Sequence, residues 1–122
     1  MQFQRDELLS QLIQHGWRIA GEEENLEWWA DEIWHLESEW SPVGSRAYVT
    51  FLVDPQFDGV RKKGEEVWAV MASPVKPIDR LNTEDEFTLS LGQGWQKRLP
   101  EFIDHLTALR QRLAGSMNGV IG

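Results

Sequence analysis

Cysteine is absent from this 122-residue sequence, which excludes disulfide bonds, thiolate metal ligands and a cysteine nucleophile. Long apolar runs are absent as well: no window approaches the ~18 consecutive apolar residues that a membrane-spanning helix needs. The first residues do not show a basic segment followed by an apolar run, so we expect no secretory signal. These absences predict a soluble, cytoplasmic protein that does not act at a membrane.

Motifs for phosphate binding and nucleophilic catalysis are also missing. The ten glycines form neither a G-x-G-x-x-G fingerprint nor a P-loop, and no serine stands in a G-x-S-x-G elbow. Positive charge is scarce, because 12 lysines and arginines stand against 20 acidic residues and the net charge is -8. A field of that sign repels nucleic acids at long range. We therefore predict a protein that is not an enzyme, holds no cofactor and could bind nucleic acid only through a local basic patch.

What the sequence does have is seven tryptophans and a regular alternation of apolar residues. Residues 6–16 show the apolar spacing of a short helix, with Asp6 as its N-cap and Gly16 at its C-terminal end. Alternating patterns predict β-strands at residues 17–20, 32–40, 46–54 and 87–91. Residues 66–72 are apolar on both faces, which predicts a central strand. Strands 32–40 and 46–54 are expected to form a hairpin, and turns are expected at residues 21–25 and 41–45.

A continuous apolar stripe marks the C-terminal segment. Its apolar residues recur at steps of three and four, as on one face of an amphipathic helix. We expect this helix to begin near Trp95 or at Pro100 and to end at Gly115. The sequence thus predicts one α+β domain over residues 1–115, with an N-terminal helix, an antiparallel meander of four or five strands and a C-terminal helix, followed by a flexible tail at residues 116–122.

The apolar stripe also predicts self-association. The surplus of tryptophan and the apolar helix face would both be buried if a partner's helix covered one face of the sheet. We therefore expect a homodimer of strand-and-helix units whose helices are exchanged or packed together, and which acts through a further protein partner. The predicted dimer interface consists of Leu99, Phe102, Ile103, Leu106 and Leu109.

Two groups of residues are candidates for a metal site or a catalytic site. His35, Glu37 and Glu39 share one face of an expected strand, but alternate strand residues lie about 6.5–7 Å apart and do not converge on one ion unaided. An exposed polar face explains them equally well. The second group is an acidic cluster that comprises Glu22, Glu23, Glu24, Glu27, Asp31 and Glu32. Two of these carboxylates could form an acid–base pair, although a solvated charged segment is the simpler interpretation. We predict no metal site and no catalytic residue, and keep a small acid–base enzyme as a third alternative.

The second alternative is binding of single-stranded DNA or RNA. The only basic run, Arg61, Lys62 and Lys63, falls in an expected loop and could contact phosphates. Bases could stack on exposed aromatic rings, for which the candidates are Trp28, Trp29 and Tyr48. A solubilising loop tip explains the basic run equally well. Further cations could extend the patch, namely Arg18, Arg46, Lys97, Arg98, Arg110 and Arg112.

Three segments together resemble a known group of proteins: residues 27–34 (EWWADEIW), 46–55 (RAYVTFLVDP) and 61–70 (RKKGEEVWAV). They resemble a family of small uncharacterised cyanobacterial proteins, and the resemblance would span nearly the whole chain. It implies a fold similar to the four-strands-then-helix unit of Whirly-type and transcriptional-cofactor single-stranded DNA binders, which pair as dimers through their helices. That family carries no assigned activity, so the resemblance implies no catalytic residues.

Overall fold

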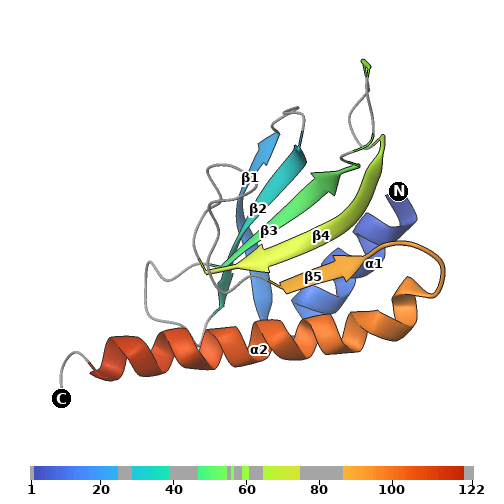
Figure 1. Cartoon of the computed structure of the whole chain (residues 1–122). Coiled ribbons are helices and arrows are strands. Elements are labelled where there is room, and N and C mark those ends of the chain that lie inside the picture. The colour runs from blue at the N-terminus through green and yellow to red at the C-terminus, as the bar shows by residue number, and fades with distance from the viewer. Residues whose placement is uncertain are drawn as a thin grey trace.

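The computed structural model of the chain describes residues 2–24, 29–38, 47–54, 56, 59–60, 65–74 and 87–119, and within the two helices it describes the side chains of residues 4–14 and 95–111. The elements follow one another along the chain in a simple order (Figure 1). They are α1 (Gln2–Gln14), β1 (Trp17–Glu24), β2 (Ala30–Ser38), β3 (Ala47–Val53), β4 (Val67–Ser73), β5 (Phe87–Ser90) and α2 (Trp95–Gly119).

The strands form one antiparallel sheet in the order β1-β2-β3-β4-β5, so each strand pairs with its neighbours in sequence. The predicted α+β class, the helix–meander–helix order and the hairpin of β2 with β3 are therefore confirmed. In that hairpin Trp34 lies opposite Val49 and Leu36 opposite Ala47. Since one face of each strand is apolar, this register places its large side chains on a common face.

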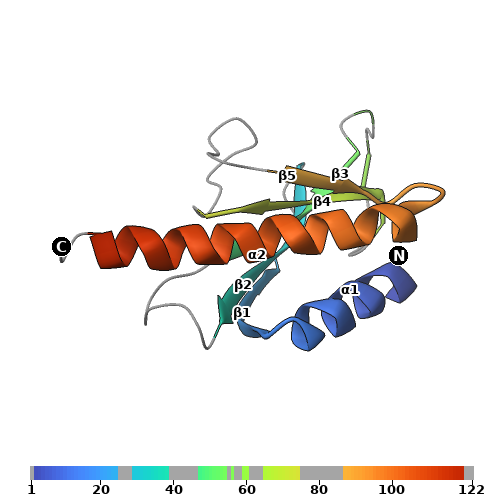
Figure 2. The same cartoon turned by 90° about the horizontal axis from the view of Figure 1, so that it is seen from below.

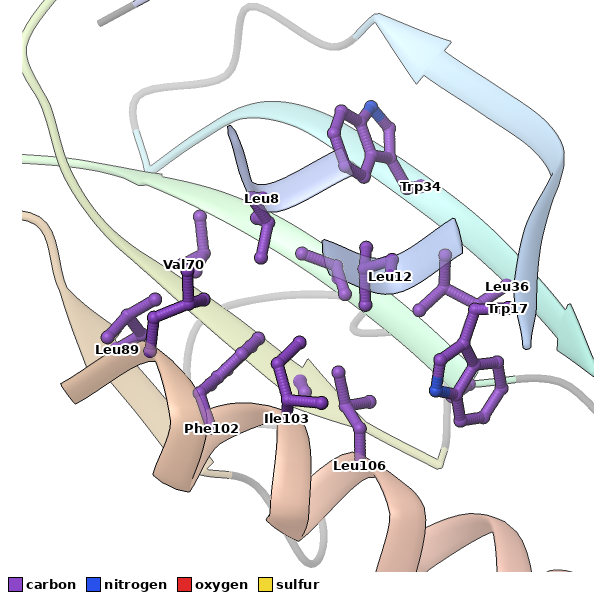
Figure 3. Close-up of a cluster of buried hydrophobic side chains, with 14 of the residues drawn as sticks. Leu8, Leu12, Trp17, Trp34, Leu36, Val70, Leu89, Phe102, Ile103 and Leu106 are labelled. Carbon is purple, nitrogen blue, oxygen red and sulfur yellow. The ribbon is translucent and has the colours of Figure 1, made fainter. Parts of the chain in front are cut away.

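Both helices cover the same face of the sheet, and the main core lies between them and the strands (Figure 2). Leu8 and Leu12 of α1 and three residues of α2 point toward the strands and are at most 3% exposed (Figure 3). Trp34 and Phe51 meet edge to face beneath them, with ring centroids 4.8 Å apart. Burial of one such side chain is worth about 1.5–3 kcal/mol, so this layer supplies most of the stability of the fold.

A second, smaller core lies on the opposite face. It consists of Trp29, Ala30, Leu52, Ala69 and Met71. Successive strand residues point to opposite faces, and β3 and β4 are apolar at nearly every position. The central strands are therefore buried on both faces. The apolar residues on both faces of segment 66–72 predict this.

Strand β1 is longer than predicted. The expected turn at residues 21–25 is wrong over residues 21–24, because β1 continues to Glu24. A bulge lies between Ile19 and Gly21, after which Glu22 pairs with Trp34 and Glu24 with Glu32. Local propensity disfavours three consecutive glutamates in a strand, but pairing with β2 overrides it.

The helix boundaries also differ from the predictions. Helix α1 begins at Gln2, so Asp6 is an internal residue and not the N-cap. Gly16 has a φ of +87°, which confirms it as the glycine that ends this helix. Helix α2 begins at Trp95 and continues past Gly115 to Gly119, because a glycine costs a helix only about 1 kcal/mol. Of the predicted flexible tail, residues 116–119 are helical and residues 120–122 lie outside the described part.

A buried arginine joins the two helices to the sheet. Arg110 of α2 is 3% exposed, and its Nη1 donates to the carbonyl of His15 at the end of α1 (2.9 Å) and to Ser38 Oγ of β2 (3.4 Å). The guanidinium also lies 5.4 Å from the ring centroid of Trp17. Burial lowers the pKa of Arg110 below its ordinary value. A cation at the C-terminal end of a helix interacts favourably with the exposed carbonyls there, so Arg110 fixes α1 against the sheet.

Candidate interaction surface at the β5 edge

The sheet has two edges, and the β1 edge carries several features that hinder pairing with another strand. Four of its eight residues are charged, Arg18 and the three glutamates, and the bulge between Ile19 and Gly21 interrupts its register. Arg18 binds Glu37 of β2 at 2.7 Å. Charges and bulges on edge strands are the usual means by which proteins prevent edge-to-edge association.

Strand β5 itself has none of these features along the residues described. Its sequence, Phe-Thr-Leu-Ser, contains no charge and no proline, and it pairs with β4 without a register shift. The one charge at its outward backbone groups among the described residues is Arg98 of α2, which donates to the Ser90 carbonyl. Thr88 and Ser90 are exposed, whereas Leu89 is buried against α2 and the sheet. Among the described strands, none pairs with the outer side of β5. An uncharged, regular edge of this kind is a template for another strand.

The direction of the backbone groups of β5 follows from its pairing with β4. The amide of Leu91 donates to the carbonyl of Trp68 at 2.9 Å, so at Leu91 the backbone faces β4. Backbone groups of an antiparallel strand alternate in direction from one residue to the next. Leu89 and Phe87 therefore also face β4, and the amide and carbonyl groups of Thr88 and Ser90 face outward.

Helix α2 lines this edge with polar side chains. Arg98, Glu101 and His105 recur at helical spacing beside Phe87, Thr88 and Leu89, around a hollow of about 130 Å³. Arg98 Nη2 donates to the outward carbonyl of Ser90 at 3.1 Å, and His105 lies against the Phe87 ring, with centroids 5.0 Å apart. Drug-sized ligands occupy about 300–1,000 Å³, so this hollow fits one side chain of a peptide better than a metabolite.

The polar residues considered for a metal or catalytic site form hydrogen bonds between β1 and β2. His35 Nε2 lies 2.7 Å from Glu23 Oε2 and its ring meets Tyr48 edge to face, while Glu37 binds Arg18. Within the described segments, no three histidine or acidic residues are placed to hold a metal ion. Glu39 and Glu27 lie outside the described residues. The pairs found here connect β1 to β2.

Two carboxylates of the acidic cluster are buried, those of Asp31 and Glu32. Glu32 is 1% exposed and accepts hydrogen bonds from Arg5 Nε and Nη2 (3.1 and 2.8 Å) and from Trp34 Nε1 (2.7 Å). The hydrogen bonds to Glu32 raise the pKa of Arg5 above its ordinary value, which Coulomb attraction to Glu32 and Glu22 reinforces while burial opposes it. The Arg5–Glu32 pair attaches α1 to β2. The contacts with Arg5 and Trp34 leave the Glu32 carboxylate no room for a substrate.

The residues predicted for nucleic-acid binding are only partly described. Trp28, Arg61, Lys62 and Lys63 lie outside the described residues. Trp29 is 5% exposed in the second core, so it presents no open ring face to a base. Tyr48 is half-buried, and its ring contacts His35. Of the further cations, Arg18 and Arg110 are bound at different places in the sheet. Nucleic-acid binding remains a prediction.

The five residues predicted for the dimer interface all lie in the main core. Leu99, Phe102, Ile103, Leu106 and Leu109 are at most 4% exposed within a single chain. They pack against the sheet of their own chain (Figure 3). A second copy could reach them only by exchanging its α2 for this one, so the dimer prediction itself remains a prediction.

Sequence reasoning found β5 but not the surface that it forms with α2. The relevant residues are Thr88, Ser90, Arg98, Glu101 and His105. A signal was present in the contrast between the uncharged segment 87–90 and the charged segment 17–24. It becomes informative only once these segments are known to be the two edges of one sheet.

No described helix is both long and apolar enough to cross a membrane. Comparison of the chain with models of protein families, with curated proteins and with solved structures found no match. The resemblance to cyanobacterial proteins and to Whirly-type folds therefore stays a prediction.

Proposed function

We propose that this chain is a non-enzymatic interaction protein that binds another polypeptide by adding it as a strand along β5. The observation that carries the proposal is the contrast between the two sheet edges: β1 is charged and bulged, while β5 is regular and uncharged. In strand addition, main-chain hydrogen bonds supply affinity and pockets beside the edge select alternate side chains. Lack of cysteine suits a reducing compartment, and we propose the cytoplasm.

Three features of the site support this mode of binding. Outward backbone groups of Thr88 and Ser90 are available for a ladder, and Arg98 already shows that the Ser90 carbonyl accepts a donor from outside the sheet. The hollow between β5 and α2 is of a size to receive one side chain. Finally, the core behind β5 is well packed, since Phe87 meets Phe102 edge to face at 5.4 Å, so the edge is held in an extended form.

The test uses a library of displayed eight-residue peptides, selected on the wild-type chain and then measured on two variants. Thr88→Pro removes an outward amide and leaves the bonds to β4 intact, because proline is tolerated on an edge strand when its nitrogen faces outward. Thr88→Val is the matched control, since it keeps the amide. We expect enrichment of peptides with alternating apolar residues, which bind wild type and Thr88→Val alike and bind Thr88→Pro about fivefold more weakly, because one backbone hydrogen bond is lost.

Two results would contradict the proposal. One is a selection that enriches no peptide at all. The other is a set of peptides that binds Thr88→Pro as tightly as wild type, because such peptides would use a different surface.

A further inference from the structure

We infer that the polypeptide that pairs with β5 is a second copy of this chain, joined edge to edge across a two-fold axis. This inference rests on the proposed function, because it names the partner of the same edge. Closed two-fold dimers are the commonest oligomers, and their interfaces must be self-complementary. The β5 edge and the adjoining part of α2 meet that requirement in both hydrogen bonding and charge.

Hydrogen bonding is self-complementary around Leu89. In an antiparallel pairing centred on this residue, Thr88 of one copy lies opposite Ser90 of the other. These are the two residues whose amide and carbonyl groups face outward from the sheet. The pairing forms one hydrogen-bonded pair on each side of the axis. The Ser90 carbonyl can keep its bond to Arg98, because a carbonyl oxygen has two lone pairs.

Charge is self-complementary along α2. The exposed, fully charged residues of α2 that line the hollow beside β5 run from basic to acidic, with Arg98 followed by Glu101. A two-fold axis reverses the second helix, so Arg98 of one copy faces Glu101 of the other, and the pair occurs twice. Opposite potentials that meet across an interface fix its register.

The local charge also explains why this surface can approach its own copy. The whole chain carries a net charge of -8, which opposes self-association in general. Between Arg98 and Glu101, however, the two signs balance, and β5 itself has no charge. On the β1 edge, by contrast, three glutamates outnumber the single arginine. The β5 edge is thus the edge where like-charge repulsion between copies is smallest.

The test is the oligomeric state of the full chain by sedimentation equilibrium at low salt. We expect wild type and Thr88→Val to form a dimer at micromolar concentration. Thr88→Pro should weaken the dimer about 30-fold, which corresponds to two backbone hydrogen bonds lost per dimer.

Charge variants test the register. Glu101→Arg places a cation against Arg98 of the second copy at two symmetric positions, and we expect about tenfold weaker association, that is, about threefold for each pair. The double variant Arg98→Glu with Glu101→Arg restores opposite charges across the axis and should associate more tightly than Glu101→Arg, with the remaining loss due to the missing hydrogen bond from Arg98 to Ser90. Circular dichroism before and after heating verifies that each variant is folded. Recovery in the double variant is a result that a merely destabilised fold would not give.

The outcomes separate this inference from the proposed function. A wild-type monomer that still binds selected peptides at β5 overturns the second copy as partner and leaves strand addition in place. A dimer that is unchanged by Thr88→Pro overturns the inference in favour of another interface, such as exchanged α2 helices. A dimer lost in Thr88→Pro and in Glu101→Arg, and partly recovered in the double variant, supports it.

Discussion

The two edges of the sheet illustrate two ways to end a β structure. At β1 the chain combines charges with a bulge, with the ion pairs Arg18–Glu37 and Arg5–Glu22 to the neighbouring strand and helix, and with a hydrogen bond between His35 and Glu23. At β5 it places four uncharged residues over a well-packed helix. Proteins with an exposed regular edge are prone to aggregate unless the edge is used. This difference supports the proposal that another strand pairs with β5 and not with β1.

The largest expected effect concerns the packing that supports β5. Phe102 is 3% exposed and contacts Phe87, so Phe102→Ala should lower the free energy of unfolding by about 3–5 kcal/mol. Urea denaturation measures this loss. Hydrogen exchange should show that amides of β5 lose more protection than those of β1, because the cavity lies beneath β5.

Leu12→Ala is the matched variant on the other side of the core. Leu12 is fully buried on α1, and its truncation should cost about 2–5 kcal/mol while affecting β1 and β2 first. If both variants loosened the two edges equally, the sheet would behave as one cooperative unit, and the edges would not differ in how they are supported.

The next effect concerns the ion pair on the β1 side. Arg5→Met leaves the Glu32 carboxylate buried without its cation, and removal of one partner of a buried pair costs about 3–5 kcal/mol. Because Arg5 is 30% exposed, water can partly replace it, and we expect about 2–3 kcal/mol by urea denaturation. Addition of Glu32→Gln removes the charge and keeps an acceptor for Trp34, so the double variant should regain at least half of the loss. A double variant no more stable than Arg5→Met would show that the loss comes from packing and not from the unpaired charge.

Much of this architecture was predictable from sequence because it depends on local periodicity. The apolar stripe on α2, the alternation in segment 46–54 and the apolar run in segment 66–72 are each patterns of several residues. Each corresponds to an element of the structure at nearly the expected residues. The continuation of β1 through Glu22, Glu23 and Glu24 was not predictable in this way. It depends on Arg5 and His35, which are distant in sequence.

The candidate surface escaped prediction for a related reason. Leu99 and Phe102 show an apolar pattern that either a partner or the chain's own sheet would satisfy, and sequence cannot distinguish the two. Thr88 and Ser90 are ordinary strand residues until the strand order makes β5 an edge. Edge position is a property of the whole sheet, so it is absent from any single segment.

A smaller effect concerns the connections that lead to the two edges. Gly16 precedes β1 with a φ of +87°, and a Cβ there would lie 3.3 Å from Arg110 Nη1. Gly16→Ala should therefore cost about 1–2 kcal/mol. Gly92 follows β5, and a Cβ there meets only Ser90 Oγ, at 3.8 Å, so Gly92→Ala should change stability by less than about 0.5 kcal/mol. Thermal unfolding of the two variants compares them directly, and equal losses would mean that the contact with Arg110 and the positive φ are relieved by movement of the chain.

The smallest expected effect is that of Thr88→Pro on the stability of the monomer. Its amide faces away from β4, so proline removes no bond of the sheet, and we expect a change within about 1 kcal/mol when unfolding is measured at a concentration too low for association. Leu89→Pro is the counterpart one residue along the strand: it removes a bond to β4 and a buried side chain, and should cost about 3 kcal/mol or more. If the two prolines were equally harmful, the outward direction assigned to Thr88 would be wrong. The edge would then present the backbone groups of Phe87 and Leu89 instead, and the pairing of Thr88 with Ser90 about the two-fold axis could not form.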